Sequence, residues 1–162
     1  MSQEMEYTEN RDHERGIHTE TIAERGSQRP YWHALQELAS NLLGKLLLPG
    51  DPDFEVQRKV WSGAVNHRPA LIVRCTNAND VVSSVTFARE QDLPVSVRSG
   101  GHSAAGYGTN DGGIVIDLSL MKAVAINPEQ RTARIEPGLT WGEVAHALQP
   151  YGLALTSGDV SA

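Results

Sequence analysis

Apolar positions along the chain separate a polar N-terminal stretch from a long region with helix-like and strand-like spacing. Residues 1–29 are mostly Glu, Arg, Asp, Thr, Gln and Ser, and such a stretch cannot bury enough apolar surface to offset the entropy of ordering it. We therefore predict a disordered tail over residues 1–29. Apolar side chains then recur at helical spacing at Trp32, Leu35, Leu38, Ala39, Leu42 and Leu43. They predict a helix with Pro30 in its first turn and Gly44 as a left-handed stop, followed by a turn over residues 47–52.

Strand and helix patterns alternate from Ala70 onward. Short runs rich in Val, Ile and Leu predict strands at residues 71–74, 95–98 and 114–118. A helix over residues 77–90 separates the first two of these strands, with Asn77 as its cap. The apolar face of this helix is predicted to consist of Val81, Val85 and Ala88.

The second half of the pattern predicts a hairpin and a short helix. Strands at residues 123–126 and 132–135 flank a turn at Asn127-Pro128. Thr140 and Glu143 form a capping box that opens a helix to about residue 149. Gly152 is expected to stop this helix, and residues 153–155 to start another strand. The order of elements predicts an α+β or α/β fold, with a tail (1–29), an N-terminal helix and connecting segment (30–66) and one main domain (67–162).

Charge and composition exclude several classes of partner. The 162 residues carry a formal net charge of −6 and no basic run, so neither nucleic acid nor an anionic membrane surface is an expected partner. No apolar run reaches the roughly 20 residues that span a bilayer. The polar N-terminus lacks a secretory h-region, which predicts a cytoplasmic protein. The single cysteine, Cys75, is expected to be a buried thiol, and the scattered histidines predict no metal site.

Candidate chemistry is concentrated in a glycine-rich loop that directly follows a predicted strand. The segment from Arg98 to Gly108 has four glycines among eleven residues. Glycine permits positive φ and lets main-chain N–H groups approach an anion, and Arg98, Ser99 and Ser103 add donors, so a pyrophosphate is a suitable guest. The same composition also fits a simple turn. The loop is not a P-loop, because no Gly-Lys-Ser/Thr follows. It is not a dinucleotide fingerprint either, because G-x-G-x-x-G is absent and the next element is predicted to be a strand.

Five segments resemble the berberine-bridge-enzyme-like flavoproteins of the vanillyl-alcohol oxidase and p-cresol methylhydroxylase (PCMH) superfamily. They are Arg68-Pro69-Ala70-Leu71-Ile72-Val73, Val97-Arg98-Ser99-Gly100-Gly101-His102-Ser103, Val115-Ile116-Asp117-Leu118-Ser119, Glu136-Pro137-Gly138-x-x-Trp141-Gly142 and Gly152-Leu153-Ala154. The resemblance covers about residues 44–162. It implies an α+β, PCMH-type FAD-binding domain, here incomplete at its C-terminus, with a substrate domain that would follow.

The resemblance also implies which residues hold FAD. The pyrophosphate and flavin contacts fall on Arg98, Ser99, Gly100, Gly101, His102, Ser103, Gly106 and Tyr107, and on Ser157 and Gly158 at the start of a second loop. His102 stands where the family often bonds a ring nitrogen covalently to the flavin 8α carbon. A second link through a cysteine, used by some members, is not expected, because Val160 stands near that place.

Other conspicuous side chains are given structural interpretations. Trp61 and Trp141 are expected to lie in the core rather than to stack on a flavin. Tyr107 either contacts the cofactor or packs within its loop. Asp117 is expected to bind loop backbone and not to be catalytic.

The implied function is that of an FAD-dependent oxidoreductase, which removes a hydride from a small organic substrate to flavin N5, with O₂ as acceptor. The substrate pocket and catalytic base are expected beyond Ala162, so no residue here is assigned as catalytic. Two alternatives remain open: a reductase that holds FAD noncovalently and takes electrons from a nicotinamide, and a non-catalytic flavin-binding remnant. Unpaired sheet edges and exposed apolar faces are expected to make these 162 residues poorly stable or self-associating.

Overall fold

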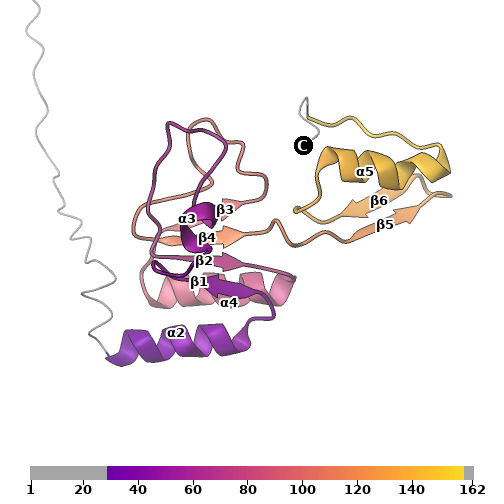
Figure 1. The fold of residues 1–162 in the computed structure, drawn as a ribbon. Coiled ribbons are helices and arrows are strands. Elements are labelled where there is room, and N and C mark those ends of the chain that lie inside the picture. Colours follow the sequence, from indigo (N-terminus) through magenta and orange to yellow (C-terminus); the bar gives the residue numbers. More distant parts are fainter. Residues whose placement is uncertain (1–28, 159–162) are drawn as a thin grey trace, which may run out of the picture.

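The computed structural model describes residues 29–158 and shows a four-stranded sheet joined to a smaller hairpin-and-helix unit (Figure 1). The sheet consists of β1 (Lys45–Leu47), β2 (Leu71–Arg74), β3 (Val95–Arg98) and β4 (Ile114–Asp117), in the order β1-β2-β4-β3. The strands β2, β4 and β3 run parallel, while β1 runs antiparallel along the outer edge of β2. Because three strands are parallel, their carboxyl ends meet at one edge of the sheet.

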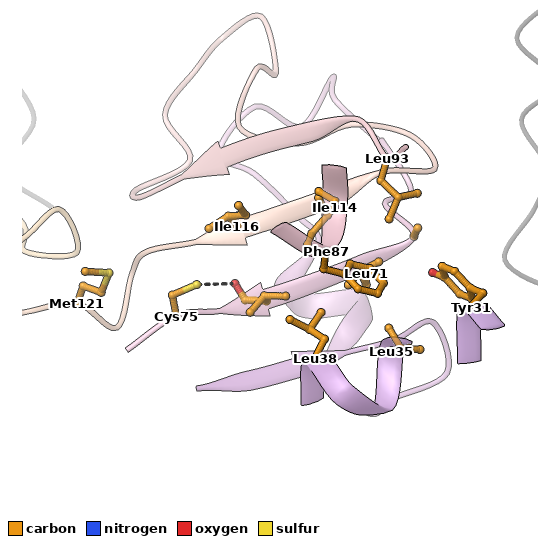
Figure 2. Packing of buried hydrophobic residues seen from close by; sticks show 13 residues of the cluster. Tyr31, Leu35, Leu38, Leu71, Cys75, Phe87, Leu93, Ile114, Ile116 and Met121 are labelled. Carbon is orange, nitrogen blue, oxygen red and sulfur yellow. Dashed lines mark hydrogen bonds between the residues drawn. The ribbon is translucent and has the colours of Figure 1, made fainter. Parts of the chain in front are cut away.

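Two helices, α2 (Arg29–Asn41) and α4 (Ala78–Glu90), lie together on the sheet (Figure 1). The aromatic rings of Tyr31 and Phe87, one from each helix, pack 6.1 Å apart between their centroids. The largest buried cluster combines side chains from both helices and from β2 and β4, including Leu35, Leu38, Leu71, Phe87, Ile114 and Ile116 (Figure 2). The cluster on the opposite face of the sheet is smaller. It contains Leu47, Ile72 and Val115 together with Phe54 of the short helix α3 (Phe54–Gln57).

The smaller unit contains β5 (Val124–Asn127), β6 (Thr132–Ile135), α5 (Trp141–Leu148) and the short 3₁₀ helix η1 (Gln149–Tyr151). The two strands pair antiparallel as a hairpin. Thr140 caps α5 in a complete capping box with Glu143, as the sequence predicts. Gly152 stops η1 in the left-handed region, at φ 62°.

A buried carboxylate ties the start of α4 to the end of α2. Asp80 is 1% exposed. Its side chain accepts hydrogen bonds from the amides of Leu43, Gly44 and Thr76 at 2.8–3.0 Å and from the Thr76 hydroxyl at 3.0 Å. These four donors compensate the loss of water around a charged group.

Most predicted elements are confirmed, and several details are wrong. The sequence pattern missed β1 and α3, which have three and four residues. Residues 153–155 form no strand. Val85 is 48% exposed, because Asp80 and Ser84 occupy the buried face of α4 instead.

Gly44 also has a different role from the predicted one. Its φ is not positive, so it is not a left-handed stop; a Cβ there would lie 2.0 Å from the carbonyl oxygen of Arg74. The strand β3 alternates as predicted, but Val95 and Val97 are exposed while Ser96 and Arg98 are buried. The predicted tail, apart from Arg29 in α2, lies outside the described residues. Among the described helices, none combines the length and apolar character needed to cross a bilayer.

Candidate functional site

A cavity of about 750 Å³ lies beside the carboxyl ends of β3 and β4. This is where open α/β sheets bind their ligands, because loops and free main-chain groups gather there. One wall is the loop after β3, and another is the connection after β4 together with the start of α5. The lining residues are Trp61, Ser99, Gly100, His102, Ser119, Lys122, Gly138, Leu139, Thr140, Trp141 and Gly158.

The loop after β3 is bent by glycine and partly covered by an imidazole. Gly101 has a φ of 70°, a left-handed conformation that favours glycine. A Cβ on Gly100 would lie 2.6 Å from the Cδ2 atom of His102, so this ring lies directly over the Gly100 main chain. The His102 side chain is exposed, and within residues 29–158 no protein group hydrogen-bonds to it. The ring is therefore available to a ligand.

A buried ion pair supports this loop from below. A guanidinium Nη2 of Arg98 lies 2.5 Å from a carboxylate oxygen of Asp117, and the two side chains are 6% and 3% exposed. Burial acts to raise the pKa of Asp117, but hydrogen bonds from Ser119 and Arg98 outweigh it and hold the pKa below its ordinary value. The Arg98 side chain also lies against Gly101, with 3.4 Å between its Cδ and the position of a Cβ on that glycine. The predicted backbone role of Asp117 is seen at the Ser119 amide, which donates to it at 2.9 Å.

The second wall is tied to the first by the Ser99 side chain and is itself held together by close main-chain contacts. The Ser99 hydroxyl donates to the Pro137 carbonyl oxygen. A Cβ on Gly138 would lie 2.5–2.7 Å from three carbonyl oxygens, those of Leu118, Ser119 and Met121. Glycine is thus required at position 138 by space, and the first turn of α5 is brought beside the glycine loop.

A surface-facing ion pair lies where the cavity meets α5. The ammonium of Lys122 lies 2.6 Å from Glu143 Oε1, and the two side chains are 46% and 40% exposed. The other carboxylate oxygen of Glu143 accepts from the Thr140 amide at 2.7 Å. The Lys122 ammonium first, and the Thr140 amide second, hold the pKa of Glu143 below its ordinary value.

The structure brings together four of the ten residues expected to contact FAD. Ser99, Gly100, His102 and Gly158 line the cavity. The remaining six do not line it: Arg98, Gly101, Ser103, Gly106, Tyr107 and Ser157. Arg98 lies under the loop, and the Ser103 hydroxyl accepts from the Tyr107 amide at 3.2 Å within it. The Tyr107 side chain is 82% exposed and does not line the cavity.

The predicted core positions of Trp61 and Trp141 are wrong. They are 72% and 37% exposed, and both line the cavity. The amide of Trp61 donates to the Gly101 carbonyl oxygen at 3.1 Å, which holds the segment carrying this indole beside the glycine loop. A sequence alone does not separate an apolar cavity wall from a core, because both favour large apolar side chains.

Sequence reasoning predicted the capping box that opens α5, but it did not place Lys122, Ser119 or the start of α5 in the site. The element that follows the glycine loop is the strand β4, so it offers the site no helix N-terminus. The helix comes instead from the capping box at Thr140, more than thirty positions later in the chain. Cys75 is buried as predicted, and burial raises the pKa of its thiol to about 11.

The residues on the walls fit a flavin dinucleotide. The cavity volume lies within the roughly 300–1,000 Å³ of small-molecule and cofactor sites. Glycine main chain, hydroxyls and one ammonium suit phosphates, while two indoles and Leu139 suit planar apolar rings. The His102 imidazole, which has no hydrogen-bond partner among residues 29–158, also lines the cavity.

Comparison with known proteins gives the same assignment. Residues 69–161 match the family described as FAD binding domain. The chain is 42% identical over 118 residues to (R)-6-hydroxynicotine oxidase of Paenarthrobacter nicotinovorans, a match that covers 73% of this chain and 26% of that enzyme.

Two solved structures share the fold. The carbohydrate oxidase of Microdochium nivale superposes with a TM-score of 0.68 at 29% identity, over 77% of this chain and 27% of that one. The BBE-like 1 protein of Physcomitrella patens superposes with a TM-score of 0.66 at 25% identity, over 72% of this chain and 26% of that one. The chain thus spans about a quarter of the length of the relatives that it matches. It belongs to the FAD binding domain family, as a partial PCMH-type domain of the berberine-bridge-enzyme-like FAD-linked oxidoreductases in the vanillyl-alcohol oxidase superfamily.

Proposed function

We propose that this chain binds FAD in the cavity beside β3 and β4 and attaches it covalently through His102. The observation that carries the proposal is the His102 imidazole, which has no hydrogen-bond partner among residues 29–158 and lies over Gly100 on the wall of a cavity of suitable size. A neutral imidazole nitrogen is a nucleophile, so it would supply the electron pair for a bond to the flavin 8α carbon, which would give up a proton, and the two electrons left on the flavin would pass to O₂. Such a bond anchors the cofactor and tunes its electronics.

In this proposal each wall has a separate task. The main chain around Ser99, Gly100 and Gly101 receives the pyrophosphate, while Arg98 and Asp117 hold that loop in place from below. Trp61 and Trp141 cover planar rings of the cofactor and exclude water from them. Gly158, with Ser157 beside it, opens a second contact. Gly106 and Ser103 shape the loop, and Tyr107 shields it from outside.

The whole protein is proposed to be an oxidoreductase acting on a small organic substrate, with O₂ as electron acceptor. Bound FAD supplies the two-electron acceptor at flavin N5. The relatives are named for a hydroxynicotine and for carbohydrate, so they favour no single substrate. The substrate pocket and catalytic base are proposed to lie in the part of the relatives' length that this chain does not span. A cytoplasmic location stays a prediction.

The test is to express the chain with added FAD and to examine it on a denaturing gel for flavin fluorescence. Fluorescence should travel with the polypeptide, and His102→Ala should abolish it. His146→Ala is the matched control, because this exposed histidine of α5 does not line the cavity. Flavin that is bound but released by acid would contradict the covalent link and favour a noncovalent reductase. If no flavin absorbance remains with the purified chain, the proposal fails in favour of a non-binding remnant.

A further inference from the structure

The cavity offers a diphosphate little permanent positive charge. Among the described residues that line it, Lys122 is the one with an ammonium or guanidinium group. The nearby guanidinium of Arg98 is buried and paired with Asp117 at 2.5 Å, so it is not free to turn toward a ligand. A diphosphate carries two negative charges, and charge-assisted hydrogen bonds to such groups are stronger than neutral ones. Lys122 is therefore the side chain best able to balance that charge.

Lys122 is held on the wall by a carboxylate that belongs to the helix. Glu143 contacts the ammonium through Oε1 at 2.6 Å and the Thr140 amide through Oε2 at 2.7 Å. The carboxylate therefore serves the capping box and the lysine together. Because Glu143 is anchored by the capping box and Lys122 is a flexible side chain, the lysine is the partner that can move.

We propose that Lys122 binds the diphosphate group of FAD and that Glu143 competes with the cofactor for it. This inference rests on the proposed binding of FAD in the cavity. Without FAD, Lys122 and Glu143 form an ion pair of no net charge at the edge of the cavity. With FAD bound, the ammonium contacts the diphosphate and Glu143 keeps its bond to the Thr140 amide. Glu143 thus lowers the affinity for the cofactor while it stabilises the helix.

The proposal gives opposite signs for two substitutions. Lys122→Met removes the ammonium and keeps an unbranched side chain, and FAD should bind roughly fivefold to tenfold more weakly, as expected for a partly exposed charged hydrogen bond. Glu143→Gln removes the competing charge, yet glutamine still completes a capping box, so FAD should bind about twofold to threefold more tightly. Riboflavin has no phosphate, and its affinity should change less than about twofold in either variant.

The experiment titrates each variant with FAD and with riboflavin and follows the quenching of flavin fluorescence at equilibrium. All proteins are the full 162-residue chain carrying His102→Asn, so that no covalent link holds the ligand. Lys45→Met is the matched control, because Lys45 forms an exposed ion pair with Asp53 at the same 2.6 Å and does not line the cavity. Thermal unfolding of every variant verifies that it is folded.

Each outcome separates this inference from the function on which it rests. Selective loss of FAD affinity in Lys122→Met, with a gain in Glu143→Gln, supports the inference. Equal FAD affinities in Lys122→Met and Lys45→Met overturn it while the proposed FAD binding stands. Parallel loss of FAD and riboflavin in Lys122→Met also overturns it, since the lysine would then act on the flavin or on the fold. If the chain with its native His102 retains no FAD, the proposed function itself fails.

Discussion

Two buried carboxylates each connect separate elements of this chain. Asp80 joins the ends of α2 and β2 at the start of α4, and Asp117 joins β4 to the glycine loop through Arg98. Both side chains are almost completely buried, which is uncommon for aspartate unless its oxygens are well supplied with donors. The number of donors around each explains why these acids are retained inside.

The Asp80 network predicts a specific pH dependence of stability. Burial acts to raise the pKa of Asp80, but donors at Thr76, Leu43 and Gly44 outweigh it and lower the pKa. A carboxyl group whose folded pKa is lowered stabilises the fold above its unfolded value of about 3.9, and this stabilisation is lost as the pH falls through the lower folded value. Asp80→Asn should therefore lower the free energy of unfolding at neutral pH by about 2–4 kcal/mol.

Urea unfolding between pH 7 and pH 3 measures this effect. The difference between the wild-type chain and Asp80→Asn should shrink as the pH falls below about 4. Asp92→Asn is the control, because Asp92 is exposed at the end of α4 and asparagine tolerates its positive φ of 51°. Equal losses in both variants, or a difference independent of pH, would refute the assigned role of Asp80.

At the level of elements, the junction between β4 and the hairpin unit sets the shape of the cavity. Gly138 lies where the chain returns from β6 and passes the β4–β5 connection. Its amide donates to the Met121 carbonyl oxygen at 2.8 Å. The Ser99–Pro137 hydrogen bond lies beside this contact. The chain that returns to α5 is thus held against the β4–β5 connection by main-chain contacts, and the Ser99 side chain links it to the glycine loop.

Gly138→Ala should loosen this junction. The added methyl group would lie 2.5–2.7 Å from three carbonyl oxygens, so the β4–β5 connection and the segment before α5 must separate. We expect a loss of about 1–3 kcal/mol in the free energy of unfolding, which is the usual cost of overpacking. The loss in the free energy of FAD binding should be larger than this loss of stability. Gly63→Ala provides the comparison, because a Cβ there meets nothing within 4 Å. Similar urea midpoints for the two variants would show that the junction yields without cost.

The elements that sequence patterns predicted well are those with strong local signals. β2 and β4 are buried on both faces, so they appear as continuous aliphatic runs, and α4 and α5 have side-chain caps at Asn77 and Thr140. β1 and α3 are too short to show a period, and their residues lie beside turn signals. The predicted buried face of α4 was wrong because Asp80 lies in the interior with its hydrogen-bond donors. The spacing of apolar residues does not reveal a buried polar side chain.

The site as a whole shows the same limit. The composition of the glycine loop also fits a simple turn, so its predicted role and that of His102 came from the resemblance to a known family. The opposite wall comes from positions 119–141, and its proximity depends on how the chain runs out from the carboxyl end of β4 into the hairpin unit and returns to α5 (Figure 1). That is a tertiary arrangement, so Lys122 and the exposed indoles carried no local signal of their role.

At the scale of the whole molecule, the sheet has an unprotected edge at β3. Val95 and Val97 are in register with Ile114 and Ile116, so the four side chains share the face that α2 and α4 cover. The helices do not extend over β3, where Val95 and Val97 remain 46% and 55% exposed. An exposed apolar strand at a sheet edge can pair with another chain. The expectation of self-association therefore has a definite location.

The corresponding prediction is concentration-dependent association of the 162-residue chain through β3. Sedimentation equilibrium should show an apparent mass that rises with protein concentration, and Val97→Lys should bring it toward the monomer, because a charge on an edge strand opposes pairing. Val82→Lys adds the same charge to an exposed valine of α4 and should leave association unchanged. A constant monomer mass in the unsubstituted chain would contradict this prediction. Equal effects of Val97→Lys and Val82→Lys on the apparent mass would contradict an interface at β3. If the chain associates through β3, its unfolding transition should also be broader and its denaturant slope lower than those of a compact monomer, because self-association removes two-state behaviour.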